Sequence, residues 1–153
     1  MSSTKDYQPY SANAQGFTEV LIDFKKTLED KSTQDIIGFQ SIALENISQG
    51  QAVYCRASDG KVGLATCNST LDLAIVAGFA RTAKTTGQTL DVLISGIVSS
   101  SGLDAGNIYY LGASPGVVVS TPPSTSGQYL TRVGEANNSS QLIIRLEPPV
   151  LLV

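Results

Sequence analysis

The pattern of apolar and polar residues beyond Gly38 predicts a series of short β-strands. Alternating or continuously apolar runs, bounded by Gly, Asn, Asp or Pro, occupy residues 41–47, 51–56, 61–65, 73–82, 88–97, 107–111, 116–120, 128–136 and 141–147. Asp59-Gly60 is a dipeptide typical of a tight β-hairpin turn. No connection between these runs is long enough for a crossover helix, which disfavours a βαβ arrangement. We therefore predict a mainly β fold, a small antiparallel β-sandwich or barrel.

The first 37 residues have a different character. Ten of the 23 charged residues lie in the first 35 positions. Within residues 17–31, apolar side chains recur at helical spacing, at Phe17, Val20, Leu21, Phe24 and Leu28. This spacing predicts a short amphipathic helix, although alternation through Val20, Ile22 and Phe24 leaves a strand as the other interpretation. We divide the chain into an N-terminal arm with a short helix, residues 1–37, and a β-rich domain, residues 38–153.

Residues 1–16 show neither helical nor strand periodicity. One interpretation is a disordered terminus. The other is an arm whose aromatic residues Tyr7, Tyr10 and Phe17 anchor onto a neighbouring subunit, because each such side chain buries a large area with few rotatable bonds. The sequence leaves both interpretations open.

The last residues form an apolar tail. Pro148 and Pro149 end the preceding strand pattern, and Val150, Leu151, Leu152 and Val153 follow. The tail either packs over the core of its own domain or docks onto a partner subunit, because a free apolar tail promotes aggregation. We take Val150, Leu151 and Leu152 as interface candidates, together with Tyr109 and Tyr110 of the aromatic-rich run at 107–111.

The residues that carry most enzyme chemistry are missing or scattered. The sequence has no histidine and two cysteines, so it lacks the usual general base and too few thiols remain for a zinc site. Carboxylates are spread over separate turns, and the glycine-rich segment 112–116 lacks the Gly-Lys-Ser/Thr ending of a phosphate loop. We predict a protein that is not an enzyme, with no catalytic residues, metal or cofactor. Cys55 and Cys67 are expected to be reduced, small core residues.

Charge and hydropathy further restrict the classes of function that the sequence allows. Charged residues make up 15% of the chain, the net charge is −3, and the ten cations are scattered, which disfavours nucleic acid as a partner. No apolar stretch is long enough for a membrane-spanning helix, and residues 1–7 lack a secretory signal pattern, so we expect synthesis in a cytoplasm. Low charge suits a protein that buries much of its surface in an assembly.

Several segments of the β-rich domain resemble a known module. They are residues 87–98, 103–112, 116–123, 129–136 and 142–144, with 50–54, 59–65 and 77–80 similar to its first half. Together they resemble a β-rich module of tailed-phage virion proteins, which include head decoration (capsid cement) proteins and fibre or spike components. The matching motifs shape a fold and do not form a catalytic site.

The resemblance implies a structural role without an active site or cofactor, and self-association, often as a trimer. A module that stands alone behind an N-terminal arm looks like a capsid decoration protein, which binds the major capsid protein on the surface of the virion. The alternative is a tail fibre, spike or baseplate component that binds host-surface glycan or other tail proteins. Residues 1–37 do not match the module.

Overall fold

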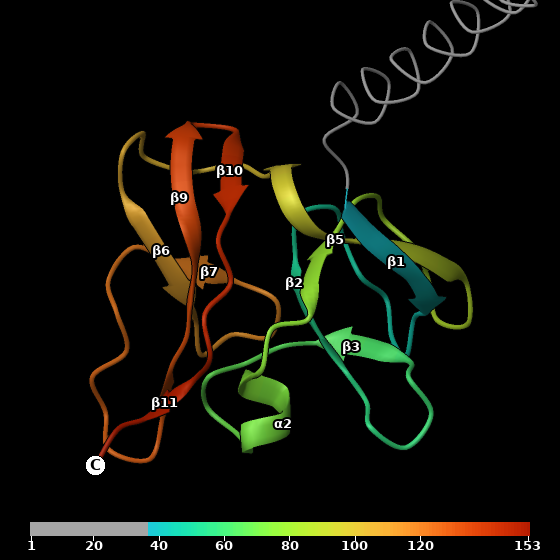
Figure 1. Ribbon diagram of the computed structural model, residues 1–153, viewed down its shortest axis with the longest axis horizontal. Helices are drawn as coiled ribbons and strands as arrows, with labels where there is room; N and C mark the ends of the chain where they lie inside the picture. Colours follow the sequence, from blue (N-terminus) through green and yellow to red (C-terminus); the bar gives the residue numbers. More distant parts are fainter. Residues whose placement is uncertain (1–36) are drawn as a thin grey trace, which may run out of the picture. The chain divides into compact units, whose positions relative to one another are not determined.

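The computed structural model describes residues 37–153. Predictions for residues 1–36, including the helix within 17–31 and the anchors Tyr7, Tyr10 and Phe17, lie outside the described residues. The strands are β1 (Ile37–Ile42), β2 (Ala52–Cys55), β3 (Val62–Leu64), β4 (Gly78–Ala80), β5 (Thr89–Ser99), β6 (Ile108–Leu111), β7 (Val118–Val119), β8 (Tyr129–Leu130), β9 (Arg132–Asn138), β10 (Gln141–Ile144) and β11 (Val150–Leu151). One helical turn, α2 (Leu71–Ala74), precedes β4 (Figure 1).

The described strands confirm the predicted mainly β, antiparallel fold. Nine strands form one sheet in the order β3-β2-β4-β5-β10-β9-β6-β7, with β1 paired to β5, and β8 and β11 form a separate two-stranded ribbon. Every ladder between these named strands is antiparallel. The sheet is strongly bent into two halves. The first half contains β1 to β4 and the first part of β5, and the second half contains the end of β5 with β6, β7, β9 and β10. Figure 1 shows them as two groups of strands.

Strand β5 joins the two halves of the sheet. Its first part pairs with β1 and β4, and its last part, Gly96–Ser99, pairs with β10. Gly96 lies where the pairing changes and has a φ of +93°. An L-residue with a side chain rarely adopts this conformation, so glycine allows β5 to bend from one half of the sheet into the other.

The first half curls until its edges meet. Leu44 N–H donates to Val62 O at 2.8 Å, and Ala43 and Val62 form a parallel bridge. The small side chains Ala43 and Ala80 and the β-branched Val53 and Val62 are fully enclosed. Together with the larger side chains of Ile47 and Leu90, they fill the interior of a barrel-like half-domain.

A second core lies between the two halves. Phe79 and Leu93 come from the first half, and Leu111, Val133 and Leu142 come from the second. All five are buried. These side chains pack face to face as in a sandwich, and the burial of such a large apolar cluster is the main stabilising contribution.

The strand predicted at 73–82 is only partly present. Residues 71–74 form α2, and the strand is limited to β4. The helical turn follows the polar residues Asn68, Ser69 and Thr70, and Thr70 is an extended residue at the N-cap position. The apolar run at 73–80 hides this turn because alternation cannot distinguish one helical turn from the start of a buried strand.

Two other strand predictions are displaced or divided. The strand expected at 41–47 lies earlier, as β1, and only Ala43 and Ile47 form bridges beyond it. The strand expected at 128–136 is divided at Thr131 into β8 and β9, which belong to different sheets. Thr131 is fully buried and donates its hydroxyl to Ala74 O at 2.9 Å, so the chain turns inward where continuous alternation predicts a single strand.

Candidate assembly surfaces

The ribbon of β8 and β11 holds the C-terminal residues in an extended conformation. Val150 and Leu151 pair with Leu130 and Tyr129 of β8. Beyond β11, Leu152 N–H donates to Gln128 O, and Leu152 O accepts from Gly127 N–H, both at 2.8 Å. The backbone of the tail is therefore fixed by its neighbour β8.

The side chains of this ribbon remain at the surface. Val150 is 57% exposed and Leu151 is 50% exposed, while Leu152 is half-buried. The tail is thus ordered by backbone hydrogen bonds and does not bury Val150 and Leu151 in the core of its own domain. The exposed apolar ribbon, defined as β8, β11 and residues 152–153, has the composition of a docking surface.

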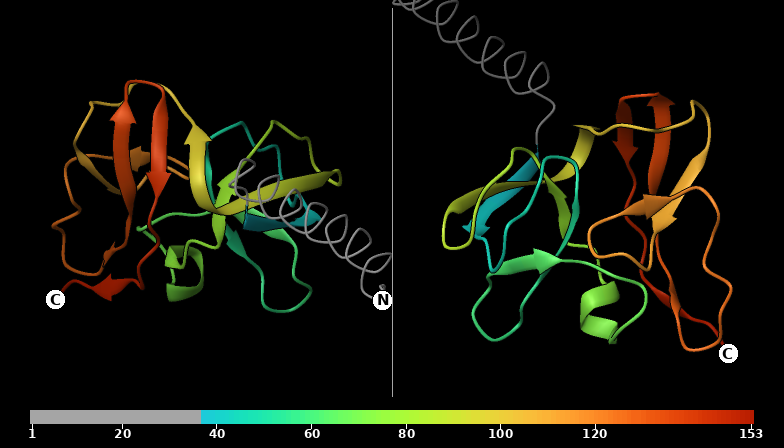
Figure 2. Two further views of the ribbon diagram at one scale, coloured as in Figure 1. Left: turned by 45° about the horizontal axis from the view of Figure 1, so that its top comes forward. Right: turned by 180° about the vertical axis from the view of Figure 1, so that it is seen from behind.

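The same end of the domain carries α2. Figures 1 and 2 show α2 and β11 at one end of the molecule in each view. Two large apolar side chains of this segment, Leu71 and Ile75, are exposed. Tyr129 N–H donates to Cys67 O at 3.0 Å, which ties the loop before α2 to the ribbon. The sequence interpretation included the tail but missed Leu71 and Ile75, because Ile75 lay within the strand expected at 73–82 and Leu71 lay just before it.

The two tyrosines proposed as interface residues have different environments. Tyr109 is 4% exposed and belongs to the core between the two halves of the sheet. Its hydroxyl accepts a hydrogen bond from Asp104 N–H at 2.8 Å. Tyr109 is therefore a core residue of its own domain and offers no surface to a partner. Its neighbour Tyr110 is half-buried and points to the opposite side of β6.

The cysteines also differ from each other. Both are free, but only Cys67 is buried, whereas Cys55 is exposed near the β2–β3 turn. The expectation of two core cysteines is therefore wrong for Cys55. Burial raises the pKa of the Cys67 thiol, because desolvation disfavours the thiolate.

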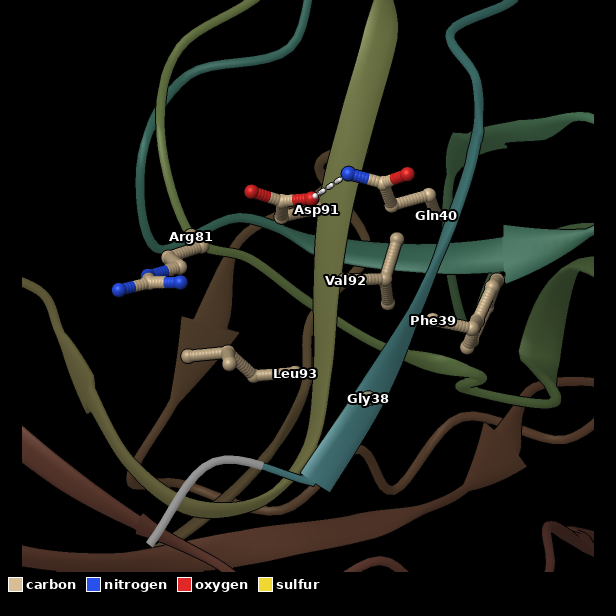
Figure 3. A pocket seen from close by; sticks show the side chains of 7 residues that line it. All are labelled: Gly38, Phe39, Gln40, Arg81, Asp91, Val92 and Leu93. Carbon is tan, nitrogen blue, oxygen red and sulfur yellow. Dashed lines mark hydrogen bonds between the residues drawn. The ribbon is translucent and has the colours of Figure 1, made fainter. Parts of the chain in front are cut away.

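A surface pocket of about 320 Å³ lies where β1 crosses β5 (Figure 3). Its polar residues are Gln40, Arg81 and Asp91, and its other lining residues are Gly38, Phe39, Val92 and Leu93. Gln40 Nε2 donates to Asp91 Oδ1 at 2.8 Å. One carboxylate and one guanidinium do not form the pair of acid and base that proton transfer needs, so this pocket has no evident catalytic arrangement.

An exposed ion pair lies at the β2–β3 hairpin. Arg56 Nε donates to Asp59 Oδ1 at 3.0 Å, and Lys61 N–H donates to the same oxygen at 3.1 Å. The Arg56 guanidinium lowers the pKa of Asp59 to about 2. This ion pair fixes the turn that the Asp59-Gly60 dipeptide predicted. It leaves the carboxylate engaged within the turn.

The part of the chain that the structure describes contains no group of three or more His, Cys, Asp or Glu side chains able to hold a metal ion. Among these residues no helix has the length and hydropathy to cross a membrane.

Comparisons with known proteins give little further information. No protein-family model matches the chain, and no curated protein is similar to it. Among solved structures, one similar chain comes from the capsid of Myoviridae Phage XM1. It is 14% identical, the alignment covers 71% of this chain and 81% of that chain, and the TM-score is 0.45. A likeness this distant does not establish a family for this protein.

Proposed function

We propose that this protein is a capsid decoration protein of a tailed phage. In this role it is made in the host cytoplasm, associates with itself, as a trimer, and binds the major capsid protein at the surface of the virion. The exposed apolar ribbon is the observation that carries the proposal. The sequence resemblance of residues 38–153 to a virion module supplies the biological setting.

The ribbon suits attachment because it combines order with an uncharged apolar surface. Its backbone is fixed by hydrogen bonds from Gly127 and Leu152, so little conformational entropy is lost when a partner covers it. Between Asp104 and Arg132 no residue is charged, and none is charged from 148 to 153. Docking this surface therefore removes apolar area from water without removing a charged side chain.

Such contacts would stabilise a capsid by mass action. A protein that binds the assembled lattice and not free subunits shifts the equilibrium toward the assembled state. A contact of standard size buries about 800 Å² on each partner. At about 25 cal/mol per Å² of apolar surface, several kcal/mol remain after the costs of association. Trimers suit three-fold positions of an icosahedral lattice, where each contact repeats by symmetry.

The N-terminal arm supplies a second attachment element in this proposal. Tyr7, Tyr10 and Phe17 are its aromatic anchors. Replacing all three with alanine is expected to weaken capsid attachment and to leave the β-rich domain folded. Attachment equal to that of the wild-type protein would remove the arm from the mechanism.

The decisive experiment is co-sedimentation of the purified full chain with undecorated phage capsids and, separately, with host cells. We expect binding to capsids, and the Leu151→Asp variant is expected to bind at least about tenfold more weakly, because a buried carboxylate opposes docking. The matched control is Phe39→Asp, an exposed apolar residue of β1 away from the ribbon. This control should bind like the wild-type protein.

Each alternative outcome has a defined meaning. Binding to cells and not to capsids would replace the decoration role with that of a fibre, spike or baseplate component that recognises the host surface. If Leu151→Asp and Phe39→Asp weaken capsid binding equally, the ribbon is not the surface that binds the capsid. Light scattering on the free protein tests the trimer, and a monomer at all concentrations would contradict self-association.

A further inference from the structure

The outer face of the second half of the sheet is apolar on the side that faces away from the core. Ile97 of β5 lies opposite Ile143 of β10, Ile143 lies opposite Glu135 of β9, and Glu135 lies opposite Ile108 of β6. Three isoleucines thus occupy one row across four neighbouring strands. Ile97 is 48% exposed, and the other residues of the row are half-buried. The solvent face of an antiparallel sheet is usually polar.

The adjacent row continues this surface. A β-bulge inserts Val133 between the pairs Tyr109–Gly134 and Tyr110–Arg132. Because of the bulge, Val133 points into the core and Arg132 lies on the outer face beside Tyr110. Tyr110 in turn pairs with Val119 of β7. We call these two rows the outer face; its members are Ile97, Ile108, Tyr110, Val119, Arg132, Glu135 and Ile143.

The charges of the outer face have a fixed order along β9. Arg132 lies near one end and Glu135 lies three residues further along. The contact of Arg132 with Glu147 is long, 3.8 Å between Nη1 and Oε2, and the buried Nε of Arg132 has no hydrogen-bond partner. Arg145, exposed after β10, adds a second cation near the Arg132 end. The Arg132 end of the face therefore carries two cations and the carboxylate of Glu147, and the other end carries the carboxylate of Glu135.

We infer that the outer face packs against the same face of a second copy of this chain, with the two β9 strands antiparallel. A two-fold axis between the sheets and perpendicular to β9 places Arg132 of each copy opposite Glu135 of the other. The same operation places Ile108 opposite Tyr110, so an apolar contact lies beside the ion pairs. A two-fold contact is self-complementary by symmetry, and the order of charges on β9 meets this requirement.

The second copy is the occupant that this charge pattern favours. An unrelated partner would need only a generally apolar surface. A second copy in the antiparallel orientation also brings a positive charge opposite each negative charge on β9. This contact is distinct from the ribbon, which lies in β8 and β11, and it does not depend on a capsid. Combined with a trimer, a two-fold contact of this kind would give a hexamer of closed symmetry.

The test is sedimentation-velocity ultracentrifugation of the full chain and of charge-reversal variants over a range of concentrations. The wild-type protein is expected to have twice the mass of the assembly that remains when the face is disrupted. Glu135→Arg replaces the one carboxylate of the outer face with a cation that would lie opposite Arg132 of the other copy, so we expect the dissociation constant to rise at least about tenfold. The double variant R132E/E135R restores the opposite charges and is expected to recover most of the affinity.

Two further variants provide a second disruption of the face and a control for reversed charge. Ile97→Asp changes an exposed residue at the edge of the row and is expected to disrupt the same contact. Arg81→Glu reverses an exposed charge in the pocket of the other half and is expected to have no effect. Far-UV circular dichroism verifies that each variant is folded. If the wild-type mass equals that of Glu135→Arg, or if the double variant fails to recover, the inference is wrong.

Discussion

Gly38 of β1 and Gly78 of β4 approach the same stretch of β5 from its two edges. A Cβ atom on Gly38 would overlap the carbonyl oxygen of Val92, and one on Gly78 would overlap the carbonyl oxygen of Leu93. Neither glycine has a positive φ, so the reason for glycine is space and not backbone conformation. The two residues allow three strands to approach closely where the first half of the sheet curls.

This relationship predicts the effect of adding a methyl group at either position. Gly38→Ala and Gly78→Ala are each expected to lower the free energy of unfolding by about 1–3 kcal/mol, because the contacted atoms are backbone and cannot rotate away. The control is Gly63→Ala, whose Cβ would meet the side chains of Glu45 and Tyr54. Urea unfolding followed by circular dichroism measures all three. A larger loss for Gly63→Ala than for Gly78→Ala would contradict this account.

The double variant of Gly38 and Gly78 tests whether the two sites act on one segment. Because both substitutions displace the backbone of residues 92–93, their effects on unfolding free energy are expected not to add. Once β5 has moved to relieve one overlap, the second substitution meets a changed backbone. Additivity within about 0.5 kcal/mol would indicate two independent sites.

The sequence predicts much of the sheet because half-buried strands carry a simple signal. In β5, Leu90 and Val92 are buried and alternate with the more exposed Thr89 and Asp91, so its period of two is visible without a structure. The hairpin between β2 and β3 is equally local, because Gly60, with a φ of +74°, ends a turn that spans only residues 57–60. Features that depend on neighbouring residues in the chain are therefore predictable.

Features that depend on distant contacts are not predictable in this way. Tyr109 and Tyr110 are adjacent aromatic residues, and only the packing of Tyr109 against the core of the other strands shows which one is buried. The sequence contains one weak indication of the outer face. Leu142, Ile143 and Ile144 form a continuous apolar run, and such a run places apolar side chains on both faces of a strand. Such a run predicts a strand, but it does not indicate what covers the second face.

The Arg56–Asp59 ion pair predicts a contribution to the stability of the fold that changes with pH only in the acid range. The pKa of Asp59 is lowered to about 2 from an ordinary value of 3.8, so the carboxylate contributes fully above the ordinary value and loses its contribution as the pH falls toward 2. A carboxyl carbon titration by NMR should find this low pKa. In Arg56→Ala the pKa of Asp59 should move upward, because the guanidinium is the main cause of the shift.

A matched substitution separates this effect from general changes in charge. Arg81→Ala removes a cation far along the chain from the hairpin and should leave the pKa of Asp59 unchanged. An ordinary pKa for Asp59 in the wild-type protein would show that the ion pair is not formed in solution.

The two cysteines predict unequal reactivity toward a thiol reagent such as Ellman's reagent. Cys55 is exposed and is expected to react rapidly in the folded protein, with one equivalent released per chain. Cys67 is buried, and its raised pKa keeps the thiol protonated, so it should react only when the domain opens. Cys55→Ser should abolish the rapid phase, and the slow phase should accelerate in urea. Two rapid equivalents in the wild-type protein would place Cys67 at the surface.

The hydroxyl of Thr131 predicts a link between the ribbon and α2. Thr131 is fully buried and donates to Ala74 O at the end of α2, at 2.9 Å. Thr131→Val keeps the shape of the side chain but removes the donor, so a buried carbonyl loses this partner. We expect a loss of about 1–3 kcal/mol in unfolding free energy. The loss should be accompanied by faster hydrogen exchange at the amides of Ala74 and Ile75, which donate to Thr70 O and Leu71 O within this turn.

The control for this substitution is Thr89→Val. Thr89 is exposed at the start of β5, so the same chemical change there should alter stability by no more than about 0.5 kcal/mol. If Thr131→Val destabilises the domain without changing exchange in α2, the hydroxyl supports the core but does not hold the helical turn. If stability is also unchanged, the hydrogen bond contributes nothing, and the division between β8 and β9 must depend on packing alone.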